Sequence, residues 1–181
     1  MNVLRQAYLY SNQLTECFAN IADDEYFKYY ISSYSVFELD LKGNDWGDRS
    51  YVSVDKDNNV IGYLHYSIDR YSNNVYDFVI VNFTKKINVT FALDLKKFLL
   101  DVFLKFNFDK AEWCVIVGNP IEKSYDKICE IAGGRIVGTF KRNIKLFDNE
   151  YYDKKFYEVL REDFINSKAY KMLKRRDLEW G

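Results

Sequence analysis

The sequence predicts a mixed α/β fold in which helices cover both faces of a mostly antiparallel sheet. Two observations lead to this prediction. Two alternating apolar runs flank an Asp- and Asn-rich turn at residues 55–59, which is typical of an antiparallel hairpin. Further along, strand-like composition at residues 75–81 gives way to helical apolar spacing at residues 89–103. With 181 residues, one proline and no linker-like tract, residues 1–181 are expected to form a single domain.

The first part of the chain is expected to supply a strand and two helices. Residues 3–10 can form the strand, and Ser11 can cap a helix that runs to about Ile21. Two aspartates then restart a helix over residues 25–34, whose aromatic side chains are expected to pack in the core but could also wall a pocket. Residues 35–49 have no clear apolar period, which predicts an irregular crossing by a strand or loop.

The middle of the chain predicts a meander of three antiparallel strands. Alternating apolar, β-branched and aromatic residues place these strands at residues 51–54, 60–68 and 75–81. His65 is the only histidine of the chain and falls in the second strand. We therefore expect a ring satisfied by its neighbours rather than a His-based triad or a multi-histidine metal site.

A polar loop at residues 82–88 and a helix at residues 89–103 follow the third strand. Asn88 can cap the helix, because its amide oxygen can accept one of the first free backbone N–H groups. Lys85 and Lys86 lie in the loop, so a phosphate could bind at the helix N-terminus. A solvated turn between a strand and a helix is the alternative explanation of the same residues.

The second half continues with a strand, a helix, a closing hairpin and a polar C-terminal helix. Gly118-Asn119-Pro120 ends the strand, and Gly133-Gly134 stops the helix. The expected ranges are residues 111–117 for the strand, 121–132 for the helix, 135–146 and 152–159 for the hairpin, and 161–176 for the polar helix.

Composition argues against several classes of function. The chain has 26 basic and 27 acidic residues, so no global attraction to nucleic acid or to an anionic membrane is expected. No stretch approaches transmembrane length and the N-terminus lacks a signal-peptide segment, so we expect a cytoplasmic protein. The three cysteines are far apart and show no CxxC spacing, which predicts neither a disulfide framework nor a metal site.

The element order and two motifs resemble the Gcn5-related N-acetyltransferase (GNAT) superfamily over most of residues 3–162. Gly118-Asn119-Pro120, followed by a helix and Gly133, resembles the strand–Asn–helix–Gly segment of that family. The closing section resembles the branch that acetylates the N-termini of ribosomal proteins. This second likeness is carried by Arg135-Ile136-Val137-Gly138, Asp148-Asn149-Glu150, Asp153, Tyr157 and Leu160-Arg161.

The resemblance implies acetyl-CoA as the cofactor, with a divergent loop for its diphosphate. The family loop usually reads Arg or Gln, two residues, Gly, one residue, then Gly or Ala. Lys85, Asn88 and Thr90 stand at the corresponding positions, so both glycines are replaced. Gly134 is a second departure, because the family usually has an aromatic residue there. The implied cofactor-binding residues are Val81, Asn82, Phe83, Lys85, Lys86, Asn88, Val89, Thr90 and Asn119.

The resemblance also implies direct transfer of an acetyl group to a primary amine, on a protein N-terminus or a small molecule. Asp77 lies where some members carry a base, and strand alternation places it, partly buried, on one face with Val79 and Val81. Backbone N–H groups of residues 81–83 would polarise the thioester carbonyl. The thiolate would take a proton from Tyr125, one helical turn before Cys129, which stands four residues before the helix-ending glycine.

Alternatives remain for each of these assignments. Asp77 could be a solvent-facing acid at a strand end, and Tyr125 could be a packing residue. The whole chain could be a degenerate GNAT-fold protein without catalysis that acts as a binding module. For the acetyltransferase we expect a monomer or a homodimer. A basic cluster near the C-terminus could bind nucleic acid, but neighbouring acids favour a solvated helix. The cluster is Lys168, Lys171, Lys174, Arg175 and Arg176 with Tyr170, and the acids are Glu162, Asp163, Asp177 and Glu179.

Overall fold

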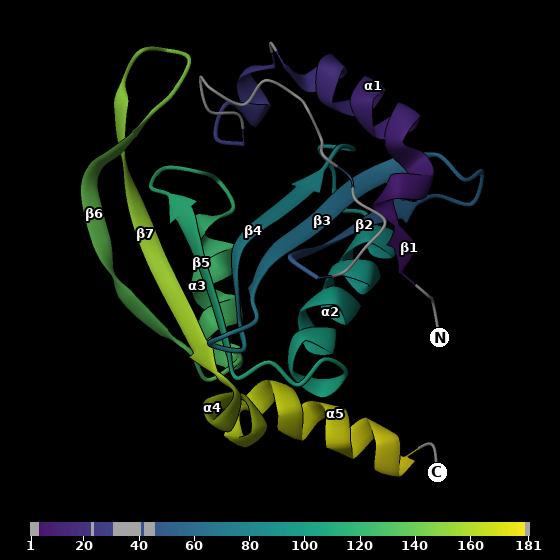
Figure 1. The fold of residues 1–181 in the computed structure, drawn as a ribbon, viewed down its shortest axis with the longest axis vertical. Helices are drawn as coiled ribbons and strands as arrows, with labels where there is room; N and C mark the ends of the chain where they lie inside the picture. The colour runs from purple at the N-terminus through teal and green to yellow at the C-terminus, as the bar shows by residue number, and fades with distance from the viewer. Residues whose placement is uncertain (1–3, 23, 31–40, 42–45, 180–181) are drawn as a thin grey trace.

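The computed structural model describes residues 4–22, 24–30, 41 and 46–179, whose elements are labelled in Figure 1. The strands are β1 (Arg5–Gln6), β2 (Asp48–Val54), β3 (Val60–Asp69), β4 (Asn74–Asn82), β5 (Lys110–Ile116), β6 (Arg135–Lys145) and β7 (Tyr151–Leu160). The helices are α1 (Ser11–Ile21), α2 (Val89–Leu104), α3 (Glu122–Ile131), α4 (Arg161–Asn166) and α5 (Lys168–Glu179), with 3-10 turns η1 (Ala7–Tyr10) and η2 (Glu25–Phe27).

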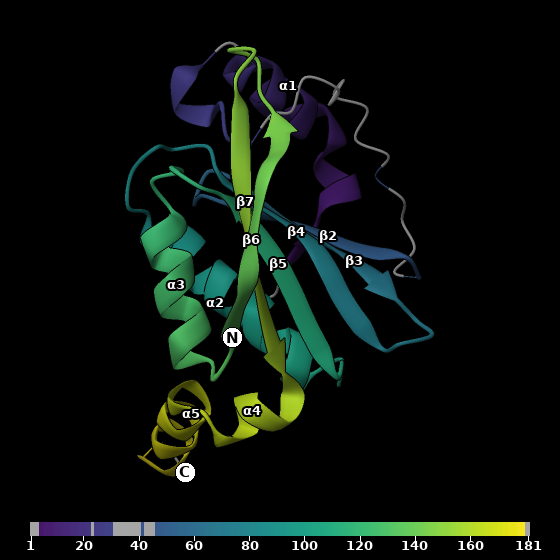
Figure 2. The ribbon, with the colours of Figure 1, turned by 90° about the vertical axis from the view of Figure 1, so that its left-hand side faces the viewer.

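One sheet runs through the described residues, in the strand order β1-β2-β3-β4-β5-β7-β6. Of the strand pairs in this sheet, only β4 and β5 run parallel. Helices α2 and α3 lie on one face and α1 lies on the other, while α4 and α5 cross the lower end of the molecule (Figures 1 and 2). These findings confirm the predicted mixed α/β fold with helices on both faces. Within the described ranges, every helix is too short or too polar to span a membrane.

The local signals of the central region are confirmed. The turn between β2 and β3 is closed by Asp55, whose carboxylate accepts hydrogen bonds from the backbone N–H groups of Asp57 and Asn59. Asn58 takes the left-handed conformation that Asn tolerates, with φ of 64°. At the start of α2, the Asn88 side chain accepts a hydrogen bond from the Phe91 N–H at 3.1 Å. Side-chain capping of this kind fixes where the helix begins.

The expected strand at residues 3–10 is wrong beyond Gln6. Only Arg5 and Gln6 pair with β2, and the chain then turns into η1. Ala7 is fully buried beneath this turn, so the chain must leave the sheet edge to bury it. The expected helix at residues 25–34 is represented by η2 alone, and its last four residues lie outside the described ranges. The crossing expected at residues 35–49 also lies largely outside them, although β2 already begins at Asp48.

The expected C-terminal helix at residues 161–176 is two helices. Ser167 separates α4 from α5 with an extended backbone, at ψ of 167°. Its N–H donates to the Phe164 carbonyl, and its hydroxyl accepts a hydrogen bond from the Tyr170 N–H. A serine that caps a new helix in this way is a recognised start signal. Because the surrounding residues are also polar, the sequence did not distinguish Ser167 as the start of a second helix.

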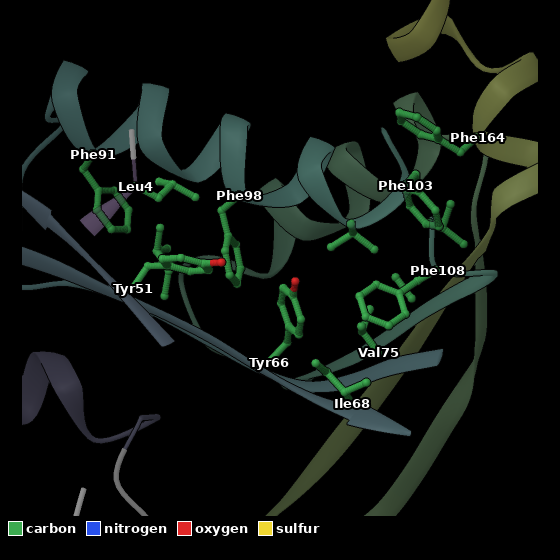
Figure 3. Close-up of a cluster of buried hydrophobic side chains, with 14 of the residues drawn as sticks. Leu4, Tyr51, Tyr66, Ile68, Val75, Phe91, Phe98, Phe103, Phe108 and Phe164 are labelled. Carbon is green, nitrogen blue, oxygen red and sulfur yellow. The ribbon is translucent and has the colours of Figure 1, made fainter. Parts of the chain in front are cut away.

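The main core lies between α2 and the sheet, as Figure 3 shows. Phe98 projects from α2 into its middle, where its ring lies 5.1 Å from the ring of Tyr66 and 6.0 Å from those of Tyr51 and Phe78. A second cluster fills the space between α1 and the opposite face of the sheet. Its buried members are Ala7, Leu14, Phe18, Ile21, Phe27, Val52, Val60, Tyr63 and Val81.

The start of α2 is seated on β3 through Gly62. A Cβ atom at Gly62 would lie 2.3 Å from the ring of Phe91, and no such contact is tolerated without movement. We expect Gly62→Ala to lower the free energy of unfolding by about 1–3 kcal/mol, as overpacked cores do. Gly138→Ala is the matched control, because nothing lies within 4 Å of a Cβ there. Urea unfolding measures both, and equal stability of the two variants would contradict the prediction.

Candidate active site

Strands β4 and β5 pair only at their first residues and then separate. The parallel pairing joins Asn74 to Lys110 and Val75 to Ala111, and extends no further. On its other edge, β5 pairs with β7 along its whole length. Figure 1 shows the ends of β4 and β5 pointing apart. The edge of β4 that faces β5 therefore has no strand partner after Val75 among the described residues.

A β-bulge at Asp77 accompanies this separation. Tyr76 pairs with Ser67 and Val79 pairs with His65, so β4 has one residue more than β3 in this stretch. Asp77 has a left-handed backbone conformation with φ of 52°. A non-glycine residue held at positive φ inside a strand points to a site where the backbone serves a function.

A cavity of about 600 Å³ lies on the α2 and α3 side of the separated strands. Its volume falls in the range of small-molecule binding sites. Lys96 and Tyr125 are the only lining residues with a polar side-chain tip, apart from the indole of Trp113. We call this the α2–α3 cavity. It is lined by Phe78, Ile80, Ala92, Leu95, Lys96, Leu99, Leu100, Val102, Phe103, Ala111, Trp113, Tyr125, Ile128, Ile131, Ala132, Val159, Phe164, Ala169, Met172 and Leu173.

Tyr125 reaches the α2–α3 cavity from α3. Burial raises the pKa of its hydroxyl, and the neighbouring Tyr30, Cys114 and Tyr157 raise it further. The phenol therefore keeps its proton at neutral pH and can donate it. Cys129, one helical turn further along α3, is buried against Val115 and Tyr157 and does not line the cavity.

Helix α3 is held in place by an ion-pair network from β7. The Lys155 ammonium lies 2.6 Å from Glu122 Oε1 and 2.9 Å from Asp126 Oδ1, both on α3. The hydroxyl of Tyr157 also donates to Asp126, at 2.8 Å. These bonds lower the pKa of Asp126 and fix the face of α3 that carries Tyr125.

Gly134, the second departure from the family pattern, is explained by its contacts. A Cβ atom there would lie 2.5 Å from the Glu158 carbonyl oxygen and 2.5 Å from Val159 Cγ2. The chain after α3 thus lies directly on β7. No aromatic side chain fits at this position.

Asp77 lies on the opposite side of the separated strands from the α2–α3 cavity. Burial lowers the pKa of His65 and raises that of Cys114, and the Asp77 carboxylate adds a smaller upward effect on the pKa of both groups, which face away from α2. The side chain is exposed rather than partly buried, so that expectation is wrong. Asp77 is also the extra residue of the bulge, so it has no pairing partner on β3.

His65 is a satisfied strand residue, as expected. Its Nδ1 lies 3.0 Å from the Ser50 hydroxyl and its Nε2 lies 3.5 Å from that of Ser67. Burial lowers the pKa of the ring, against the opposing effects of Asp48 and Asp77. The neutral imidazole thus forms part of the surface next to Asp77.

The loop before α2 is closed by its own hydrogen bonds. Asn82 accepts from the Thr84 N–H and donates to the Lys86 carbonyl at 2.8 Å. Lys85 forms an ion pair with Asp24, which ties the loop to η2. Lys86 is exposed and has no ion-pair partner among the described residues. Of the two lysines that the sequence placed at the phosphate site, only Lys86 is therefore free to bind one.

The remaining predicted cofactor residues divide into two groups. Val89 and Thr90 open α2, where the first amides of a helix have no partner within it. Phe83 and Val81 are turned away from the α2–α3 cavity: the Phe83 N–H donates to the Ile61 carbonyl at 3.0 Å, and the Val81 side chain is buried against the α1 face. The idea that the Phe83 amide polarises the thioester carbonyl is thus wrong.

Asn119 lies at the junction of β5 and α3, as predicted. Its side-chain oxygen accepts from the Ile121 N–H at 3.1 Å, and its carbonyl accepts from the Glu122 N–H. The residue is buried and hydrogen-bonded to Tyr30. Its role toward a cofactor stays a prediction.

Sequence reasoning missed much of the apolar wall of the α2–α3 cavity. Phe78 and Ile80 of β4 face α2 because the bulge reset the alternation, and Trp113 faces α3 from β5. Alternation along β5 was a usable signal for Trp113, since Ala111 and Val115 share its face. No local signal indicated that α5 would close the far end.

Comparison with known proteins identifies the fold. No protein-family model matches the chain, and no curated protein matches its sequence. Solved structures do match. A spermidine N-acetyltransferase SpeG chimera of Vibrio cholerae and hSSAT aligns with a TM-score of 0.57 and 22% identity, covering 67% of this chain and 72% of that one.

Two further Vibrio cholerae SpeG structures give the same result. A second chimera with hSSAT has a TM-score of 0.55 and 24% identity, over 68% of this chain and 71% of its own. A single-residue mutant has a TM-score of 0.55 and 18% identity, over 86% of this chain and 78% of its own. The chain therefore has the fold of the GNAT acetyltransferases.

Proposed function

We propose that the chain is an N-acetyltransferase that moves an acetyl group from acetyl-CoA directly to a primary amine. The observation that carries the proposal is the separation of β4 from β5. The opening between these strands connects the two faces of the sheet. An apolar cavity lies on one side, and Asp77 lies on the other among polar residues. A thioester held in the cavity and an amine held beside Asp77 would meet between the strands.

The residues of the α2–α3 cavity fit the arm of acetyl-CoA. The free edge of β4 offers backbone N–H and C=O groups to the amides of the arm, and Ala92 and Leu95 offer apolar contact. Val89 and Thr90 offer amide groups to the diphosphate, with Lys86 beside them. When bound, acetyl-CoA supplies an acyl group already activated as a thioester.

The two catalytic roles fall to residues on opposite sides of the separated strands. Asp77 would accept a proton from the ammonium form of the acceptor, directly or through a water, so that the amine can attack. Tyr125, whose hydroxyl is protonated at neutral pH, would give its proton to the departing thiolate. The protein would act in the cytoplasm, as a monomer or homodimer.

The structural neighbours and the sequence resemblance suggest different acceptor molecules, but both suggest a primary amine. The structural neighbours are named spermidine N-acetyltransferases, whereas residues 135–161 resemble the branch that acetylates protein N-termini. A panel of polyamines, aminoglycosides, lysine peptides and N-terminal peptides, incubated with acetyl-CoA, tests the proposal by release of free thiol. Release above the hydrolysis rate with at least one amine supports it, and no release with any of them contradicts it.

The diphosphate contact yields a prediction on the loop lysines. We expect Lys86→Ala to weaken CoA binding about tenfold at low salt and less at high salt, because a charge-assisted hydrogen bond is lost. Lys85→Ala is the matched control, since that lysine is already engaged by Asp24. Calorimetry at two ionic strengths measures both. Unchanged affinity in Lys86→Ala would remove this residue from the site.

A binding module without catalysis is the second candidate function. The loop before α2 favours it, because Ile87 is fully exposed and Val89 is 71% exposed where a phosphate would approach. Apolar side chains at that position suit a protein partner better than an anion. This candidate predicts that CoA neither binds nor stabilises the chain.

A further inference from the structure

The α2–α3 cavity continues well past the place where the thioester would lie. On the basis of the proposed function, we propose that the far end of this cavity binds the hydrocarbon tail of an acyl group longer than acetyl. A medium-chain acyl-CoA would then bind at the same site more tightly than acetyl-CoA and would be a further donor. Three features of the structure carry the inference: the length of the cavity, the chemistry of its far wall, and its continuity with the near end.

The length of the cavity can be measured along β4. The near end lies beside the start of α2, where Ala92 and Ile80 line it, and Phe78 and Tyr125 come next. The far end reaches Ala111, which pairs with Val75. Val75 precedes Phe78 by three residues, one of which is the bulge residue Asp77, so the distance is roughly 7–10 Å. An acetyl group, with two carbons, leaves this length unfilled.

The far wall is apolar on every side. Its accessible side chains come from α2 (Leu99 and Leu100), the C-terminal end of α3 (Ile131 and Ala132) and α5 (Leu173), and they lie over the buried core side chains of α2, β7 and α4. None of these side chains has a charge or a hydrogen-bond donor. Burying a polar or charged group against them would cost free energy, whereas each buried methylene is favourable. The occupant is therefore a hydrocarbon chain and not the amine acceptor.

Continuity with the near end identifies how that chain is attached. A free fatty acid would need a partner for its carboxylate, and the one cation on the cavity lining is Lys96, on an exposed position of α2. An acyl-CoA has no such need, because its charged groups lie outside at the N-terminus of α2. Its arm would fill the near end, and its acyl chain would continue into the far end.

Calorimetric titration of the full chain with CoA, acetyl-CoA, butanoyl-CoA, hexanoyl-CoA and octanoyl-CoA tests the inference. Affinity should rise by about threefold for each added methylene that enters an apolar site. At least a tenfold gain is expected between acetyl-CoA and hexanoyl-CoA. Binding of CoA and acetyl-CoA with no gain from longer chains overturns the inference and leaves the proposed function standing. Failure of all five ligands to bind overturns both.

A variant of the far end keeps the test specific. Ala169 is a half-buried residue of α5 on the lining, so Ala169→Phe should fill the far end. It should abolish the gain for octanoyl-CoA and leave the affinity for CoA within about twofold. Lys171→Phe is the control, because Lys171 is exposed and does not line the cavity. If Ala169→Phe retains the full gain, the tail does not lie in the far end. Thermal melting of the free variants shows that each is folded.

Discussion

Replacing Asp77 by asparagine should lower turnover of the best acceptor amine about a hundredfold, within the range observed for the loss of a general base. Asparagine keeps the size and polarity of the side chain and tolerates the left-handed conformation at φ of 52°. The bulge and the fold should therefore survive. The loss should fall on kcat/KM.

Glu112→Gln is the matched control for Asp77→Asn. Glu112 lies on the neighbouring strand β5, and its carboxylate forms an ion pair of 2.6 Å with Lys110. Glu112→Gln also removes one negative charge near the separated strands, but it removes a carboxylate that is already paired with Lys110. Its turnover should stay within about threefold of the wild type. If Asp77→Asn is as active as Glu112→Gln, then Asp77 is a solvent-facing strand residue and not the base.

Tyr125→Phe should lower turnover by about tenfold or more, because it removes the proton for the departing thiolate and leaves the ring in place. Burial raises the pKa of this hydroxyl, so the wild-type residue is protonated throughout the neutral range and its loss is felt there. Affinity for CoA should not change. Stopped-flow release of thiol with a saturating acceptor measures the step directly.

Tyr157→Phe separates this chemical effect from a structural one. The Tyr157 hydroxyl donates to Asp126 and helps to hold α3, so its removal should cost about 1 kcal/mol of stability. Tyr125→Phe should cost less stability and more turnover. The reverse pattern would show that Tyr125 is a packing residue and that a water protonates the thiolate.

Features set by neighbouring residues could be predicted from the sequence. The Asn88 cap depends on Phe91, three residues away, and the turn after β2 depends on contacts within residues 55–59. The end of α3 before Gly133 is also local. The cap predicted at Ser11 is wrong, because Ser11 is the first residue of α1 and Tyr10 stands at the N-cap position without a side-chain hydrogen bond. The order of such elements was enough to indicate the fold, because few arrangements bury so many alternating strands and amphipathic helices.

Features set by distant residues could not be predicted. Lys85 was placed at a phosphate site, but its partner Asp24 lies 61 residues earlier in the chain. The bulge at Asp77 shifted the faces of β4 by one residue, and apolar residues on both sides of the strand concealed that shift. The far wall of the α2–α3 cavity combines side chains from α2, α3 and α5. Contacts of this kind depend on the packed structure.

The central claim is that the α2–α3 cavity binds acetyl-CoA, and the melting temperature in the presence of acetyl-CoA tests it most directly. A ligand at a hundred times its Kd should add about 2.7 kcal/mol of stability, or roughly 5–10 °C for a chain of this size. Ala92→Trp places a bulky ring in the near end and should abolish the rise, whereas Leu93→Trp, exposed and outside the lining, should keep it. Acetyl-CoA should raise the melting temperature by an amount that grows with the logarithm of its concentration. No rise at millimolar acetyl-CoA, or an equal rise in both tryptophan variants, would contradict the central claim.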